Sequence, residues 1–177
     1  MDEKIRIIIA EDHTLVREGT RQLLDQQEDM VVVGEAADGE EAVRIADALR
    51  PDVAIIDIAM PKLNGIEATR QIKALHPATA VLILTAYDDD PYIFALLEAG
   101  AAGYLLKDVR SRELVEAVRE VHAGESVLHP AIARKVLSRF RPPPGGPAAE
   151  LEREPLTARE REVLLLAARG LSNKEVA

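Results

Sequence analysis

Five polar side chains stand where four short apolar runs end, and their types suit phosphoryl chemistry. Glu11 and Asp12 follow the first of these runs, Asp57 follows another, and Thr85 and Lys107 close two more. Two carboxylates about 4 Å apart repel by roughly 4 kcal/mol at an effective dielectric of about 20, so grouped acids need a cation or an ammonium partner. A carboxylate beside a metal ion, a hydroxyl and an ammonium can attack a phosphoryl group. This hypothesis requires that the four runs end at one place.

The apolar runs have the length and the β-branched content of buried parallel strands. The segments between them show helical spacing of apolar residues and carry turn residues such as Asp-Gly, Asn-Gly and Pro at their boundaries. Strands alternating with helices within one domain's length predict an α/β, flavodoxin-like fold, a doubly wound five-stranded parallel sheet of order 2-1-3-4-5. The expected strands are residues 5–10, 30–36, 53–57, 80–85 and 103–107.

In this strand order the first, third, fourth and fifth strands lie side by side, so the candidate residues share one crevice. Hard oxygen ligands in an incomplete set favour Mg²⁺. Asp57 is expected to be the nucleophile because it is single and central, whereas Glu11 and Asp12 can hold the metal. Lys107 and Thr85 can bind the remaining oxygens of a phosphoryl group. Each residue alone is more simply explained as a solvated strand-end group, but the coincidence at four strand ends favours a site.

The amino-acid composition is typical of a globular protein, and its two parts differ in net charge. The 177 residues are 47% hydrophobic and 30% charged, with a net charge of −9 and no cysteine, which excludes disulfides and thiolate metal sites. Residues 130–177 carry nine basic and six acidic side chains (+3), so residues 1–129 carry 13 and 25 (−12). The sequence shows neither a leader nor an apolar run of membrane-spanning length, and a cytoplasmic protein without membrane association is expected.

The composition also predicts three regions. Residues 1–125 form the α/β domain, residues 126–155 a helical extension with a Pro/Gly-rich linker, and residues 156–177 a segment with two capping-box patterns. The apolar residues of the extension could form a dimer contact or pack on the first domain, and the sequence leaves both open. These residues are Ile132, Val136, Leu137 and Phe140.

Several motifs together resemble those of two-component response regulators. Residues 1–125 resemble their CheY-like receiver domain, and residues 156–177 resemble the start of a LuxR-type helix-turn-helix. This combination is typical of the NarL/FixJ branch. The receiver motifs are Glu11-Asp12-His13, Asp57-Ile58-Ala59-Met60-Pro61 with Asn64-Gly65, Thr85-Ala86, and Gly103-Tyr104-Leu105-Leu106-Lys107.

The resemblance implies a role for each residue at the strand ends. Asp57 would accept a phosphoryl group from a sensor histidine kinase. Glu11, Asp12, Asp57 and the backbone carbonyl of Ala59 would hold Mg²⁺. Such a protein is not an enzyme, because it performs only its own Mg²⁺-dependent phosphorylation and dephosphorylation.

The resemblance also implies a switch made of Thr85 and Tyr104. The Thr85 hydroxyl would be drawn to the phosphoryl group, and the Tyr104 ring would turn inward behind it. Many receivers have a cis-proline after the lysine that ends their fifth strand, whereas Asp108 follows Lys107 here. We expect the Lys107–Asp108 bond to be cis nonetheless, although this costs about 3–4 kcal/mol in a non-proline bond.

At the level of the whole protein, the resemblance implies control of transcription. Promoter DNA would be a partner of the full-length protein only, because the helix that enters the major groove is expected after residue 177. A homodimer through the receiver or the effector domain is also expected.

Three other classes of protein are less consistent with the sequence. A Mg²⁺-dependent aspartyl phosphatase places its nucleophile after the first strand with a second acid two residues later, which Glu11-Asp12-His13-Thr14 does not match. A stand-alone receiver would act through protein contacts only, and the remaining helices of the DNA-binding domain would rule it out. A flavin site would be disfavoured because the acidic crevice repels the phosphate of the cofactor.

Overall fold

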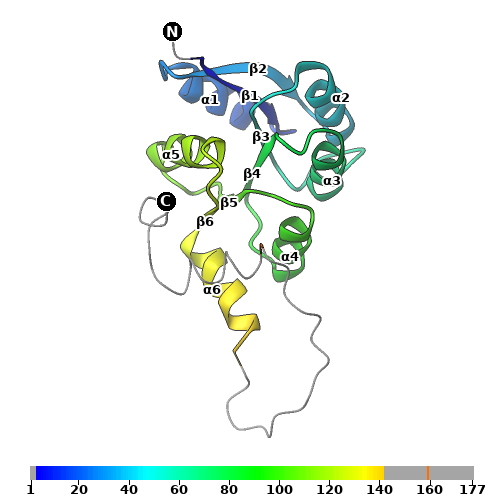
Figure 1. The fold of residues 1–177 in the computed structure, drawn as a ribbon, viewed down its shortest axis with the longest axis vertical. Helices are drawn as coiled ribbons and strands as arrows, with labels where there is room; N and C mark the ends of the chain where they lie inside the picture. The colour runs from blue at the N-terminus through cyan, green and yellow to red at the C-terminus, as the bar shows by residue number, and fades with distance from the viewer. Residues whose placement is uncertain (1–2, 142–158, 160–177) are drawn as a thin grey trace, which may run out of the picture.

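Strands and helices alternate along the part of the chain that the computed structural model describes, residues 3–141 and residue 159 (Figure 1). No helix in this part is long and apolar enough to cross a lipid bilayer. The strands are β1 (Ile5–Ala10), β2 (Met30–Ala36), β3 (Val53–Ile56), β4 (Ala80–Thr85), β5 (Gly103–Leu106) and β6 (Val127–Leu128). The helices are α1 (Thr14–Asp25), α2 (Gly39–Leu49), α3 (Gly65–Leu75), α4 (Asp90–Glu98), α5 (Ser111–His122) and α6 (Pro130–Arg139).

The sheet is parallel throughout, with the strand order β2-β1-β3-β4-β5-β6. The predicted order of the first five strands is therefore confirmed. The predicted number of strands is wrong by one, because Val127 and Leu128 pair with Gly103 and Tyr104 at the edge of the sheet. A strand of two residues is too short to show a period-two pattern in the sequence.

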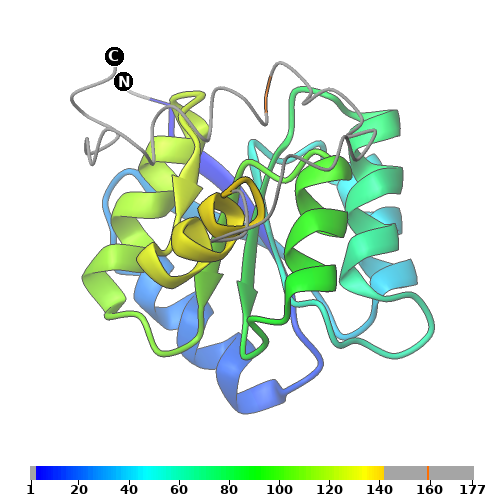
Figure 2. The ribbon, with the colours of Figure 1, turned by 90° about the horizontal axis from the view of Figure 1, so that it is seen from below.

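The two faces of the sheet are each covered by helices, as the predicted fold requires. Alternate side chains of one strand enter opposite cores, so Ile7 and Ile9 contact one cluster and Ile8 the other. Helices α1 and α5 lie on one side of the sheet, and α2, α3 and α4 lie on the other (Figures 1 and 2). Each fully buried aliphatic side chain contributes about 1.5–3 kcal/mol. Packing on both faces therefore holds the strand ends in fixed positions.

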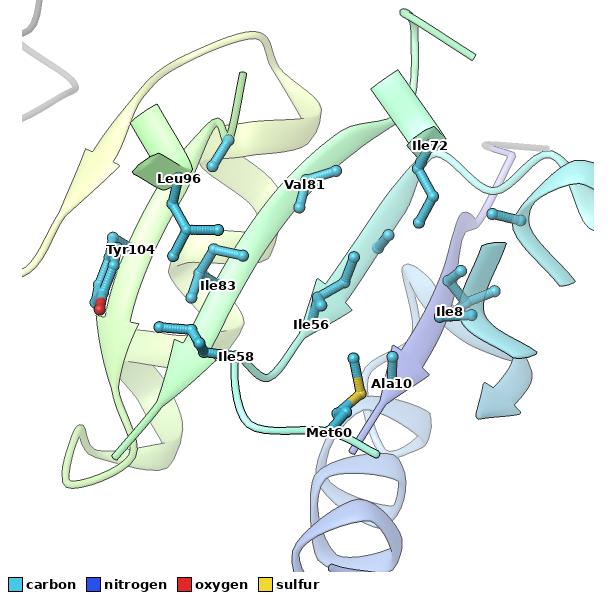
Figure 3. Packing of buried hydrophobic residues seen from close by; sticks show 14 of the residues in the cluster. Ile8, Ala10, Ile56, Ile58, Met60, Ile72, Val81, Ile83, Leu96 and Tyr104 are labelled. Carbon is cyan, nitrogen blue, oxygen red and sulfur yellow. The ribbon is translucent and has the colours of Figure 1, made fainter. Parts of the chain in front are cut away.

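Helix α6 packs on the same side as α4. Ile132 is fully buried and Val136 nearly so, and both belong to the cluster that contains Leu96 and Tyr104 (Figure 3). The guanidinium of Arg139 lies 4.0 Å from the centroid of the Phe94 ring, a cation–π contact with α4. The sequence left open whether the apolar residues of the extension form a dimer contact or pack on the α/β domain. For Ile132 and Val136, the structure shows packing on the α/β domain. The predicted linker and helix-turn-helix segment lie outside the described residues, apart from residue 159.

Candidate functional site

Strand pairing continues one residue beyond the strands and fixes the backbone of the candidate residues. The Asp57 N–H donates to the carbonyl of Ala10 at 3.0 Å, and the Lys107 N–H donates to the carbonyl of Thr85 at 2.9 Å. The Glu11 N–H donates to the last carbonyl of β2 at 3.0 Å. The ends of β1, β3, β4 and β5 therefore meet at one edge of the sheet, as the sequence predicts.

The ammonium of Lys107 lies between two buried carboxylates. Its Nζ is 2.6 Å from Glu11 Oε2 and 3.1 Å from Asp57 Oδ2. Glu11 and Asp57 are each 3% exposed. The other oxygen of Asp57, Oδ1, accepts a hydrogen bond of 2.8 Å from the N–H of Ile58. The structure thus brings together three of the residues that the sequence assigned to one site.

Burial and charge oppose each other at these groups. Burial raises the pKa of the Asp57 carboxyl, and the charge of Glu11 raises it further. Lys107 and a hydrogen bond from Thr85 lower this pKa, but the net shift is upward. Burial lowers the pKa of the Lys107 ammonium, but its hydrogen bond to Glu11 and the charge of Asp57 outweigh burial, and the pKa is raised. The lysine therefore stays charged, and one ammonium does not fully compensate the acids.

The acids beside Asp57 have the donor set that a hard cation prefers. One ligand atom each of Glu11, Asp12, His13 and Asp57 lies within 4.8 Å of the others. Asp12 Oδ1 is buried and accepts no hydrogen bond among the described residues, although His13 Nδ1 lies 3.0 Å away. Carboxylate oxygens in a partly open site suit Mg²⁺, which retains several of its waters. The backbone carbonyl of Ala59 remains a predicted ligand.

The two predicted switch residues meet at the loop after β4. Thr85 is fully buried, and its Oγ1 accepts a 3.2 Å hydrogen bond from the N–H of Tyr87. The Tyr104 ring is also fully buried, close to Ile83 and Leu96 (Figure 3), and its hydroxyl donates to the carbonyl of Tyr87 at 2.7 Å. Burial raises the pKa of Tyr104, so its hydroxyl remains a hydrogen-bond donor. Tyr87 thus connects the two predicted switch residues.

Two further residues contact the site and were given no role from the sequence. His13 Nδ1 lies 2.9 Å from Glu11 Oε1, and this hydrogen bond raises the pKa of the imidazole, as does the charge of Asp12. Arg17 Nη1 donates to the backbone carbonyl of Glu11 at 2.7 Å. His13 adjoins the acid pair in the sequence and could have been identified. Arg17 could not, because its contact depends on how α1 packs.

The expected cis peptide bond between Lys107 and Asp108 is wrong. The described residues contain no cis peptide bond. The Lys107 side chain reaches Glu11 and Asp57 with a trans bond, so its place in the site does not require the cis form, which costs about 3–4 kcal/mol.

Gly65 allows α3 to begin directly against the residue that carries the central carboxylate. A Cβ at Gly65 would lie 2.1 Å from the carbonyl oxygen of Asp57, closer than any real contact. The preceding Asn64 caps the helix, because its side chain accepts a 2.9 Å hydrogen bond from the N–H of Glu67. The Asn-Gly pair therefore positions both the helix and the strand end.

Comparison with known proteins agrees with this architecture. Residues 7–119 match the family described as "Response regulator receiver domain". The chain is 43% identical over 176 residues to the "Uncharacterized transcriptional regulatory protein YxjL" of Bacillus subtilis, which covers 99% of this chain and 80% of that protein. It is also 43% identical over 172 residues to the transcriptional regulatory protein LiaR of Bacillus subtilis, covering 97% and 80%. A LuxR-family two-component response regulator from Aurantimonas sp. SI85-9A1 has a TM-score of 0.73 at 36% identity, covering 77% of this chain and 98% of that structure.

The chain therefore belongs to the response regulator receiver family, and its relatives include transcriptional regulatory proteins and a LuxR-family two-component response regulator, as expected for the NarL/FixJ branch. The predicted family and its place in two-component signalling are confirmed. This membership disfavours the interpretations as a phosphatase or a flavin-binding protein. The similarity to YxjL also extends beyond the receiver domain, because it includes 99% of the chain.

Proposed function

We propose that Asp57 is the phosphoacceptor of this response regulator and receives its phosphoryl group from a sensor histidine kinase. The observation that carries this proposal is the placement of the Asp57 carboxylate at the end of β3, between the Lys107 ammonium and the Ile58 N–H. It is nearly fully buried, and burial together with the charge of Glu11 raises its pKa. A carboxylate whose ionised form would be stabilised by a nearby cation suits Mg²⁺-dependent phosphoryl transfer.

Glu11, Asp12 and Asp57, with the backbone carbonyl of Ala59, would hold the metal. The buried oxygen of Asp12, which accepts no hydrogen bond among the described residues, and the closeness of the acid side chains support this assignment. Bound Mg²⁺ would neutralise negative charge on the transferring phosphoryl group.

The transfer forms one bond and breaks one. A carboxylate oxygen of Asp57 bonds to phosphorus while the phosphorus–nitrogen bond of the kinase phosphohistidine breaks. The imidazole leaves with the bonding electron pair and takes up a proton. Lys107 and Thr85 then donate hydrogen bonds to the oxygens of the phosphoryl group. Water later hydrolyses the aspartyl phosphate, which makes the protein a timed switch without a separate substrate.

The added charge would act on the loop after β4. A Thr85 hydroxyl drawn to the phosphoryl group changes its contact with the Tyr87 N–H, and the carbonyl of Tyr87 is bound by Tyr104. A local change in charge would therefore bias the arrangement of the loop.

The remaining assignments rest on family membership and on the sequence. We propose a receiver domain at residues 1–125, a helical extension and linker at residues 126–155, and the start of a LuxR-type DNA-binding domain at residues 156–177. The protein would act in the cytoplasm, bind promoter DNA in its full-length form, and form homodimers.

Acetyl phosphate with Mg²⁺ tests the phosphoacceptor. Intact-mass spectrometry of the wild type should show the gain of one phosphoryl group, and Asp57→Ala should show none. Asp52→Ala, which removes another acid close to β3, should be labelled like the wild type. Equal labelling of the wild type and Asp57→Ala would refute the proposal.

A further inference from the structure

A cation from α1 holds the end of β1, and the proposed reaction does not use it. Arg17 Nη1 donates to the backbone carbonyl of Glu11 at 2.7 Å. Its Nε lies 3.6 Å from Glu35 Oε1, at the end of β2, and its side chain is only 18% exposed. Arg17 therefore ties the first helix to the ends of two neighbouring strands at the first acid of the site.

The position of this contact matters because a metal ligand depends on the groups that orient it. Partners behind a ligand fix its direction, and their loss typically weakens metal binding about 10–100-fold. The carbonyl of Glu11 precedes Asp12, so the bond from Arg17 fixes the peptide that joins the two acids. Rotation of this peptide would turn one or both carboxylates away from Asp57.

Arg21 provides a natural comparison on the same helix. It is one turn further along α1 and pairs with Glu35 and Asp25. Its side chain is 47% exposed, and it makes no contact with Glu11 among the described residues. Arg17 and Arg21 thus carry the same charge and share one partner, but only Arg17 contacts the acid pair.

We propose that Arg17 is a positioning residue for the Mg²⁺ site. It holds the Glu11–Asp12 peptide so that both carboxylates face Asp57. This inference rests on the proposed function, because it assumes that the acids bind Mg²⁺.

Calorimetric titration of the whole chain with Mg²⁺ tests the inference. Arg17→Ala should raise the Kd for Mg²⁺ about 10-fold, whereas Arg21→Ala should leave the Kd within a factor of two. Arg17→Lys should recover part of the affinity, because the ammonium can still donate to the carbonyl. Urea unfolding of each variant without metal shows whether a change in affinity occurs in a folded protein.

The possible failures are distinguishable. A wild type that binds no Mg²⁺ would overturn the metal site and the role of Arg17 together. Normal Mg²⁺ binding with equal Kd values for the wild type and Arg17→Ala would overturn the role of Arg17 alone. An equal loss of affinity in Arg17→Ala and Arg21→Ala would also overturn it, because the hydrogen bond to the Glu11 carbonyl, which Arg21 does not make, would then not be the cause.

Helix α6 shares the loop after β4 with the proposed switch. Lys135 Nζ donates a hydrogen bond to the carbonyl of Asp88 and lies 3.5 Å from Asp88 Oδ2 and from Asp90 Oδ1. Asp88 directly follows Tyr87, the residue that both Thr85 and Tyr104 contact, and Asp90 is the first residue of α4. One short loop therefore contacts the switch on one side and α6 on the other.

The start of α6 is attached to Tyr104 as well. The N–H of His129 donates to the carbonyl of Tyr104 at 3.0 Å, and the carbonyl of His129 accepts from the N–H of Ile132 at 2.9 Å. Tyr104 is thus bound to the loop through its hydroxyl and to the start of α6 through its backbone.

We infer that α6 senses the arrangement of the loop after β4. A loop that moves toward a phosphorylated Asp57 removes the partners of Lys135, and α6 loosens from α4. This inference also rests on the proposed function.

Hydrogen exchange of the whole chain, with and without beryllofluoride and Mg²⁺, tests the inference. In the wild type, the phosphoryl mimic should alter exchange in the loop after β4 and accelerate it in α6. Lys135→Ala should show fast exchange in α6 in both states, and Arg134→Ala, the exposed neighbour, should behave like the wild type. A mimic that alters the loop but not α6 would overturn this inference and leave the phosphoacceptor intact. A mimic that alters neither would overturn this inference together with the proposed switch at the loop after β4, whereas labelling with acetyl phosphate tests the phosphoacceptor separately.

Discussion

Asp57 is a buried carboxylate at which burial and charge oppose each other. Burial and the charge of Glu11 disfavour its ionised form, whereas Lys107 and Thr85 favour it. The net effect is a raised pKa, so added positive charge would stabilise the ionised form of Asp57. We therefore expect that the ionised Asp57 carboxylate lowers the stability of the metal-free protein.

This balance predicts that Asp57→Asn is more stable than the wild type in metal-free buffer at neutral pH. In the folded protein the pKa of Asp57 lies above its ordinary value of 3.8. As the pH rises from 3.8, Asp57 therefore keeps its proton longer in the folded state than in the unfolded state. The free energy of unfolding of the wild type falls over this pH range. Below this window Asp57 is protonated in both states, so the two proteins should be equally stable. Urea unfolding at neutral pH and at a pH below 3.8 measures the difference in unfolding free energy between the two proteins. A variant less stable than the wild type at neutral pH would contradict the sign.

The meeting of Glu11, Asp57 and Lys107 could be predicted because strand order alone brings their backbones to one edge. The role of Arg17 could not, because its contact with Glu11 depends on the packing of α1 and on a side-chain rotamer. The cis bond expected before Asp108 was inferred from other receivers, and the length of the lysine side chain makes it unnecessary.

Among the elements, the start of α3 depends most on one residue. Gly65→Ala would place a Cβ 2.1 Å from the carbonyl oxygen of Asp57 and 2.9 Å from the Cα of Ile58. We expect a loss of stability of about 1–3 kcal/mol or more, since backbone atoms must move. The same change should weaken labelling by acetyl phosphate, because Asp57 shifts with its backbone.

Gly19→Ala is the matched control for this substitution. Gly19 lies within α1, and nothing is within 4 Å of a Cβ added there. Alanine in a helix interior is favoured over glycine by about 0.5–1 kcal/mol, so this variant should be more stable than the wild type. Equal destabilisation by both substitutions would show that the contact with Asp57 is not the cause.

Helix α6 should fold together with the receiver domain, although it belongs to the extension. Ile132 is fully buried between α6 and the sheet, so Ile132→Ala should lower the unfolding free energy by about 2–5 kcal/mol. Arg134→Ala, at an exposed position two residues away, should change it by less than about 0.5 kcal/mol. Urea unfolding measures both. A loss near zero for Ile132→Ala would mean that α6 is detached in solution.

The sequence predicted the helical pattern of this extension but not its place. Its apolar residues suited either a dimer contact or the domain core, and β6, which directs the chain back to the sheet, has only two residues. Short edge strands depend on the partner strand more than on their own sequence.

For the whole molecule, we propose association into a homodimer. If phosphorylation drives association, light scattering should show a monomer without beryllofluoride and a mass close to twice that value with beryllofluoride and Mg²⁺. Asp57→Ala, which lacks the carboxylate, should remain monomeric in both conditions. A wild type that remains monomeric with the mimic bound would argue against association through the receiver.

The chemical location of the phosphoryl group identifies the phosphoacceptor. After phosphorylation with acetyl phosphate and Mg²⁺, borohydride reduces an aspartyl phosphate to homoserine, and mass spectrometry of the peptides identifies the residue. The proposed site predicts homoserine at position 57 in the peptide that contains β3. Homoserine at position 12, the reduced form of Glu11 at position 11, or no reduced residue in a labelled protein would contradict it.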